Sequence, residues 1–417
     1  MSGQRRWRSA TFRSLRGGNY RTWALGALVS NVGTWMQRTA QDWLVLTQLT
    51  HKNATAVGVV MALQFAPQAL LLPWTGSAAD HLDRRKLVFA TQAAMGALAL
   101  GLGLLTIAAV VRLWHVYVFA FLFGSVAAFD APARQAFVSE LVGEADLPNA
   151  VALNSTSFNS ARMIGPAVAG VLIASVGTGW VFLINAASFV AVLGSLSLLR
   201  ADELHLRRRT AHTRGSFVDG LRYLSNRPDL KVVLLMVFFL GTFGLNFPIF
   251  LSTMSVSVFH KGAGQYGLLT SIMAIGTVAG ALLAARRAEP GVVHLVAAGS
   301  VFGLGLALAA FMPSYALFSV PLVLVGVSAQ TFTTTANSLL QLSTEPVMRG
   351  RVVAIFLAIA LGSTPLGAPV VGWVADRFGP RWALGVGAAG GLAAAAVGML
   401  FLARHRQRRM AAGRLAN

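Results

Sequence analysis

Cysteine is missing from this sequence, and acidic residues are scarce: only 14 Asp and Glu stand against 34 Lys and Arg in 417 residues. Without Cys, the chain can form no disulfide, thiolate metal site or cysteine nucleophile. Charged residues make up 12% of the chain and hydrophobic residues 55%, whereas soluble domains carry about 25% charged residues. A soluble protein of this length would lack the polar surface to cover itself, so the composition predicts an integral membrane protein.

The motifs of several enzyme classes are also missing. The sequence contains no G-x-x-x-x-G-K-[ST] loop for nucleotide phosphates, no H-E-x-x-H zinc pair and no G-x-S-x-G nucleophile turn. We therefore expect no enzymatic activity, no cofactor and no metal. The net charge of +20 does not indicate nucleic acid as a partner, because the basic residues lie in the gaps between apolar runs and not on one face of a soluble fold.

Long apolar runs fill most of the chain. A helix needs about 20 mainly apolar residues to cross the hydrocarbon core of a bilayer. The sequence therefore predicts an all-α integral membrane fold of 12 transmembrane helices in two six-helix bundles, residues 22–199 and 232–403. A basic linker, 200–231, separates them, and basic tails precede and follow them at 1–21 and 404–417. The twelve predicted spans are 22–48, 56–79, 87–111, 113–133, 149–175, 179–199, 232–258, 266–285, 290–312, 315–342, 352–375 and 382–403.

The positive charges predict the orientation of the chain. If the N-terminus is cytoplasmic, the tails and the even-to-odd loops hold 27 of the 34 Lys and Arg, as the positive-inside rule expects. The basic first 21 residues are not followed by a short apolar core and a cleavage site, so they read as a retained tail. We expect both termini in the cytoplasm.

An internal repeat supports two equivalent halves. A shift of 202 positions superimposes spans 5 and 6 on spans 11 and 12 without a gap. Two parallel six-helix repeats with the substrate handled between them are a known transporter architecture. The shift pairs Gly165 with Gly367, Gly170 with Gly372 and Trp180 with Trp382.

The turn between spans 2 and 3 concentrates charge in a short stretch. Gly76 allows close helix approach, and Asp80 can accept charge-assisted hydrogen bonds. Arg84 and Arg85 complete the motif, although the positive-inside rule alone would also explain them. The spacing resembles the G-x-x-x-D-R-x-G-R-R/K turn of the major facilitator superfamily, except that His and Asp stand at positions 81 and 83. The resemblance implies a cytoplasmic gate that acts as a conformational latch. A purely orienting loop is the alternative.

Span 5 holds a second motif, R-M-I-G-P-A-V-A-G, which starts at Arg162. Pro166 bends the helix, and Gly165 and Gly170 permit tight contacts. The run is similar to the antiporter signature of the same superfamily, although ordinary Gly and Pro in a membrane helix would also explain it.

With D-A-P-A-R-Q-A-F (130–137) and P-N-A-V-A-L-N (148–154), the chain resembles the drug:proton antiporter branch that contains macrolide exporters and the enterobactin exporter. The resemblance implies a monomer in the bacterial inner membrane that uses protons to export amphipathic or drug-like small molecules by alternating access. One departure is the lack of an Arg in span 4, which other drug exporters carry. Uptake or facilitated diffusion of a nutrient, and a non-transporting scaffold or receptor, are the alternatives.

Charged residues inside spans are functional candidates because they are costly in the bilayer. Arg38 and Asp42 lie four residues apart in span 1 and share a helix face. They form either a proton-coupling pair or a static ion pair. Asp130, four residues before Arg134 near the predicted end of span 4, is a further coupling candidate, with an ion pair at a gate or loop as the alternative.

Polar side chains on single helix faces predict a substrate cavity, because such groups must face protein or water inside a membrane. Arg162 could bind an anionic substrate group, pair with Asp42 or anchor packing. The stripe in span 10 is either a cavity lining or a set of interhelical hydrogen bonds. The cavity candidates are Arg162, Asn154 and Phe158 in span 5, Gln64 and Gln68 in span 2, Asn246 in span 7, and Gln330, Thr334, Asn337 and Gln341 in span 10.

Overall fold

The computed structural model describes residues 12–71, 74, 75, 78, 81–205, 217–285 and 290–415, and every regular element in these ranges is helical. Gly76 and Asp80 lie outside the described residues. The first elements are η1 (Arg13–Arg16), α2 (Gly18–Leu44), η2 (Val45–Leu49), α3 (Ala54–Leu70), α5 (Arg84–Ile107), α6 (Leu113–Leu141), α7 (Leu147–Val176), α8 (Thr178–Ser197) and η3 (Ala201–Glu203). The others are α9 (Phe217–Ser225), α10 (Pro228–Phe239), η4 (Leu240–Gly244), α11 (Phe247–Thr253), η5 (Met254–Val258), α12 (Ala263–Ala285), α13 (Val292–Phe311), α14 (Tyr315–Leu342), α15 (Pro346–Phe378) and α16 (Pro380–Leu415).

Ten helical segments of the described chain are long and apolar enough to cross a membrane. They correspond to predicted spans 3 to 12. Helix α2, with Arg38 and Asp42 among its residues, is not one of the ten, and α3 is a shorter apolar helix. The first two of the twelve spans therefore stay predictions. Helix α6 runs to Leu141, beyond its predicted end at 133, so Asp130 lies within the helix and not beside a loop.

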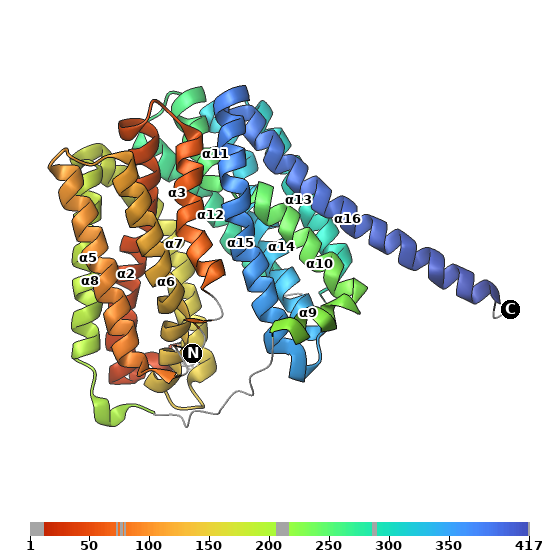
Figure 1. Ribbon diagram of the computed structural model, residues 1–417, viewed down its shortest axis with the longest axis horizontal. Coiled ribbons are helices and arrows are strands. Elements are labelled where there is room, and N and C mark those ends of the chain that lie inside the picture. The colour runs from red at the N-terminus through yellow and green to blue at the C-terminus, as the bar shows by residue number, and fades with distance from the viewer. Residues whose placement is uncertain are drawn as a thin grey trace, which may run out of the picture. The chain divides into compact units, whose positions relative to one another are not determined.

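Contacts divide the chain into two compact units (Figure 1). Unit 1 comprises Met1–Leu49, Leu70–Ala211 and Ala263–Leu268, and unit 2 comprises Thr50–Ala69, His212–Gly262 and Leu269–Asn417. Each unit thus contains one short segment from the other half of the sequence. Helix α3 packs within unit 2, and the first turn of α12 packs within unit 1.

In unit 1, α2 packs against α7 and α8, and α5 packs against α6 and α8. The core at one end of α2 contains Tyr20, Trp23 and Phe137, all at most 1% exposed. The Tyr20 hydroxyl donates to the Ala150 carbonyl at 2.8 Å, which satisfies its buried polar atom. Small residues allow α2 to approach α8, because a Cβ at Gly26 would overlap the Ser195 side chain.

In unit 2, the predicted seventh span is not one continuous helix. Helix α10 passes into the π-helical turn η4, Leu245 and Asn246 are not helical, and α11 then begins. Pro248 lacks a backbone N–H and therefore cannot bond to the Gly244 carbonyl four residues before it. A buried break of this kind is tolerated in a membrane helix only where other protein groups satisfy the backbone, and the Asn246 amide donates to the Thr242 carbonyl at 2.7 Å.

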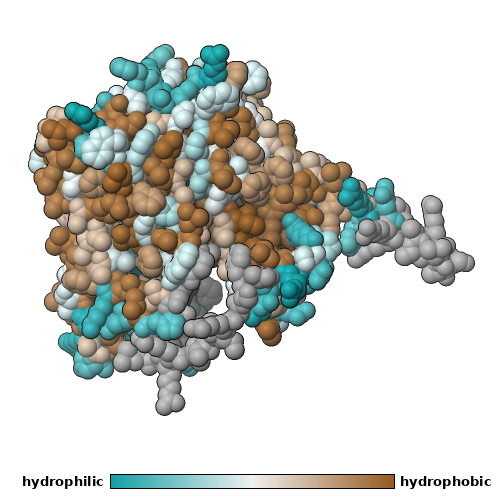
Figure 2. All heavy atoms as spheres, viewed as in Figure 1, coloured by the Kyte–Doolittle hydropathy of each residue, from teal (hydrophilic) through white to brown (hydrophobic). Residues whose placement is uncertain are grey.

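The surface has the pattern of a protein in a bilayer. On the face in Figure 2, hydrophobic side chains cover the middle of the helices, and hydrophilic side chains gather near the helix ends. Large apolar residues such as Leu104, Val190 and Phe311 are about half exposed or more. In water such extended apolar patches would be unfavourable, as expected of a membrane protein.

Candidate functional site

The centre of unit 1 holds a cluster of two Arg, one Asp and aromatic side chains. The guanidinium carbons of Arg38 on α2 and Arg162 on α7 lie 5.0 Å and 5.5 Å from the centre of the Trp35 ring. An aromatic face attracts a cation at such distances. The two positive charges repel each other. The attraction of both guanidinium groups to the Trp35 ring offsets part of this repulsion.

Asp42 supplies the negative charge of this cluster. Its side chain is 5% exposed, is attracted by Arg38 and accepts a hydrogen bond from the Tyr266 hydroxyl. The Tyr266 ring stacks on Trp43 with 6.0 Å between ring centres. Because Tyr266 lies in the first turn of α12, Asp42 binds the segment that unit 1 receives from the second half of the sequence.

Trp35 and Tyr266 were not predicted as site residues. Trp35 precedes Arg38 by three positions, so helical spacing and the affinity of guanidinium for indole could have pointed to it. No sequence signal could have placed Tyr266 beside Asp42, because more than 200 residues separate them.

Of the other predicted residues of span 5, Phe158 lies against the same cluster. Phe158 packs edge-on against Trp35 at 5.8 Å and is 47% exposed, and Asn154 is half-buried. The Gly165, Pro166 and Gly170 motif brings α7 into backbone contact with its neighbours. A Cβ at Gly165 would lie 3.1 Å from the Val32 carbonyl, and one at Gly170 would lie 2.7 Å from the Ala263 carbonyl. Gly165 thus packs α7 against α2, and Gly170 packs it against the first turn of α12.

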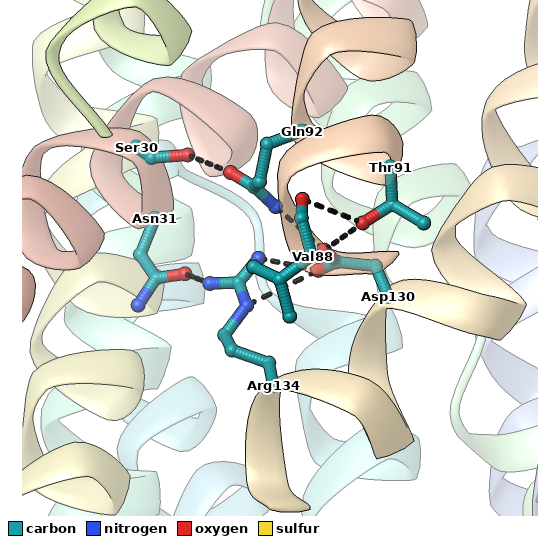
Figure 3. Close-up of polar contacts among 7 residues, drawn as sticks. All are labelled: Ser30, Asn31, Val88, Thr91, Gln92, Asp130 and Arg134. Atoms are coloured by element: carbon teal, nitrogen blue, oxygen red, sulfur yellow. Dashed lines mark hydrogen bonds and ion pairs between the residues drawn. The ribbon is translucent and has the colours of Figure 1, made fainter. Parts of the chain in front are cut away.

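Asp130 belongs to a separate buried network that joins α2, α5 and α6 (Figure 3). Its side chain is 5% exposed. One carboxylate oxygen lies 2.8 Å from the Thr91 hydroxyl and 2.7 Å from the Gln92 amide, and the other accepts two bonds from Arg134 at 2.6 Å and 3.1 Å. Arg134 also donates to Asn31 at 2.7 Å, and Ser30 donates to Gln92 at 3.1 Å. These bonds satisfy the acid on both oxygens, which favours an interhelical brace over a proton relay.

The polar stripe of span 10 lies on one face of α14, as its spacing predicts. Gln330 donates to Thr334 at 3.0 Å and Gln341 donates to Asn337 at 2.9 Å, and all four side chains are half-buried. On α3, Gln64 is buried, and half-buried Gln68 donates to the Gln64 carbonyl. Asn246 is fully buried beside the helix break in unit 2, so it does not line an open surface there.

The charged turn before α5 is braced within unit 1. Asp83 caps α5 by accepting from the Lys86 backbone N–H at 3.0 Å. Arg84 bonds to Glu140 at 2.9 Å, and Arg85 donates to the Leu196 carbonyl near the end of α8 at 2.7 Å, where a cation is favoured. Asp83, at the position where the superfamily usually has Gly, therefore has a helix-capping role of its own.

The whole chain aligns with one family of transporters. The family described as transmembrane secretion effector matches residues 9–414, and the chain belongs to this family and thereby to the major facilitator superfamily. Its relatives are multi-pass membrane transporters of bacteria and are not enzymes.

Three relatives show the breadth of the family. The chain is 26% identical to the staphyloferrin A transporter of Staphylococcus aureus over 84% of this chain and 87% of that protein. It is 26% identical to the multidrug efflux pump Tap of Mycolicibacterium fortuitum (85% and 88% covered). It is also 26% identical to the enterobactin exporter EntS of Citrobacter koseri (80% of each).

Solved structures show the same fold. A bacterial homologue of the human lysosomal transporter Spinster matches with a TM-score of 0.72 at 16% identity, covering 91% of this chain and 96% of that chain. The nucleoside transporter NupG matches with a TM-score of 0.71 at 14% identity, covering 92% and 99%.

We predict that Arg162→Ala abolishes transport without reducing the amount of protein in the membrane. The substitution removes one of the two cations that lie on Trp35, and this cation could bind an anionic group of the substrate. Loss of a hydrogen bond to a charged group lowers binding by about tenfold or more. Substrate transport into membrane vesicles, normalised to protein amount, measures the effect. Arg200→Ala is the control, because Arg200 is exposed and bonds to Glu203 on the surface of the same unit. Normal transport by Arg162→Ala would leave Arg162 a packing role only.

Proposed function

We propose that this protein is a secondary transporter of the bacterial inner membrane that exports amphipathic small molecules in exchange for protons. The observation that carries the proposal is the buried Asp42, which interacts both with Arg38 on its own helix and with Tyr266 on α12. A buried carboxylate is costly in a membrane unless it is paired or protonated. Asp42 therefore has two accessible states, paired with Arg38 when charged or neutral when it carries a proton.

Binding or release of a proton at Asp42 would change how strongly Tyr266 in the first turn of α12 is bound. The ionised carboxylate is a stronger acceptor for the Tyr266 hydroxyl than the neutral acid, so the proton alters how strongly the first turn of α12 is bound within unit 1. A proton can shift a conformational equilibrium only by the difference in its binding energy between the two states. The bond to Tyr266 supplies such a difference, because it exists only while the first turn of α12 lies beside Asp42.

The residues around the cluster favour an amphipathic substrate. Trp35 and the half-exposed Phe158 offer aromatic faces, and Arg162 offers a cation beside them. Arg38 and Arg162 carry two positive charges against the single negative charge of Asp42, so an acidic group on the substrate would balance the cluster. The names of the relatives Tap and EntS, an efflux pump and an exporter, support the outward direction. We propose that the monomer is sufficient for this activity.

Purified protein in proteoliposomes tests the proposal directly. An amphipathic fluorescent dye is loaded, and its transport is followed with an imposed pH gradient, with a sodium gradient and with neither. We expect movement against the dye gradient only with the pH gradient, in the direction opposite to the protons. Movement driven by sodium alone, or in the same direction as the protons, would contradict the proposal.

A further inference from the structure

Helix α15 carries an acid that caps a different helix. The Asp376 carboxylate accepts from the backbone N–H groups of Ala54 and Thr55 at 2.7 Å and 2.8 Å, and from the Thr55 hydroxyl at 2.6 Å. These groups form the first turn of α3, where the free N–H groups and the helix dipole favour a negative charge. Three bonds thus join two helices that are far apart in the sequence.

The backbones of α3 and α15 also touch beside these bonds. A Cβ at Gly58 would overlap the Ala368 carbonyl, and a Cβ at Gly372 would lie 2.5 Å from the Ala54 carbonyl. Small residues that face each other in this way let membrane helices pack at close range. The Asp376 bonds lie at one end of this contact, where Asp376 is exposed to solvent.

Water has access to the bonds between α3 and α15. Asp376 is exposed, and a cavity of about 450 Å³ adjoins it, lined by residues that include His51, Lys52 and Ser257. Helix α3 also has a cap of its own, because Asn53 accepts from the Ala56 N–H at 2.8 Å. Loss of the Asp376 bonds would therefore weaken the contact of α3 with α15 without unfolding the first turn of α3.

We infer that Asp376 is a latch that holds α3 on α15 and that opens when the transporter changes conformation. The structure packs α3 and α15 within the same unit, but α3 belongs to the first six predicted spans and α15 to the last six, so alternating access by movement of the two sequence repeats would part this contact. The inference rests on the proposed transport by alternating access, but not on the substrate or on the proton. The negative charge of Asp376 strengthens its bonds to the first turn of α3 and thereby stabilises the closed contact.

The absence of Cys makes the latch directly measurable. Val371 on α15 is fully buried beside Gly372, and Val371→Cys gives the protein a single thiol in a side chain smaller than the original. The rate at which a soluble maleimide labels this thiol in the purified full-length protein reports how often the buried packing of α15 beside its contact with α3 opens. We expect Asp376→Ala to raise the labelling rate about fivefold or more, and Asp376→Asn, which keeps the size and loses the charge, to give an intermediate rate.

Asn53→Ala is the matched control. It removes the cap that α3 makes for itself and leaves all three bonds to Asp376, so we expect its labelling rate to stay within about twofold of the parent. A parental rate in both Asp376 variants would overturn the inference, as would equal rates for Asp376→Ala and Asn53→Ala. The measurement uses no substrate and no pH gradient, so failure of the proposed proton-coupled export would be seen separately in proteoliposomes.

Discussion

Replacement of Asp42 by Asn is expected to abolish transport driven by a pH gradient while leaving exchange of substrate down its own gradient within about twofold of wild type. The Asn side chain keeps the size of Asp42 and can still accept a bond from Tyr266, but it cannot bind or release a proton. Arg38 loses its negative partner, so Asn fixes the cluster in the electrostatic state that a protonated acid would produce. The two activities are measured on one preparation, as dye accumulation under an imposed pH gradient and as counterflow without one.

Two further variants make the Asp42 result specific. Tyr266→Phe removes the hydroxyl but leaves the acid, so we expect transport that is slower and still driven by protons. Glu203→Gln removes an exposed acid that is paired with Arg200 on the surface of unit 1 and should change neither activity. Full pH-driven accumulation by Asp42→Asn would exclude Asp42 as the coupling site and would direct attention to Asp130.

Arg134→Gln is expected to destabilise the protein by about 3–5 kcal/mol, because it leaves a buried carboxylate without its cation. Asp130 would retain only the hydroxyl of Thr91 and the amide of Gln92 (Figure 3). Asp130→Asn should destabilise as well, since Arg134 would remain with a neutral partner. Unfolding of the detergent-solubilised protein, followed by helical circular dichroism, measures both effects.

The double variant Asp130→Asn/Arg134→Gln tests whether the two residues stabilise the protein as an ion pair. With both charges removed, the amide and hydroxyl groups of the network can bond among themselves, and we expect the double variant to be more stable than Arg134→Gln alone. Arg200→Gln, at the exposed Glu203 pair, should produce no measurable change. Losses that simply add in the double variant would show that the two charges do not act as a pair.

The spans were predictable where hydrophobicity alone decides the structure. Runs of 20 apolar residues can only be buried or face lipid, and the bounds of α14 agree with the predicted 315–342. The stripe on α14 was predictable as well, because helical spacing puts Gln330, Thr334, Asn337 and Gln341 on one face whatever the neighbours are. The break before α11 was not, because Gly and Pro are tolerated within membrane helices and their sequence signal is weak.

The parts of the site that depend on contacts between distant segments could not be predicted from the sequence. Asp130 was assigned to the end of a span because the apolar run stops there, yet α6 continues through the polar residues, since Asn31, Thr91 and Gln92 on other helices compensate their cost. Asp376 was placed beyond its predicted span and given no function. Its three bonds depend on the approach of α3, which no local pattern of α15 encodes.

The exchange of segments between the units also bears on how the chain matures on the ribosome. Ala54 leaves the ribosome 322 residues before Asp376, to which its N–H is bound in the finished protein. Asp42 likewise leaves the ribosome long before Tyr266, its hydrogen-bond donor. The first half of the chain therefore emerges with α3 lacking its final neighbour and with a charged span lacking the hydroxyl that it will bind. Unit 1 is therefore complete only once Ala263–Leu268 have been synthesised, and α3 gains its bonds to Asp376 only near the end of translation.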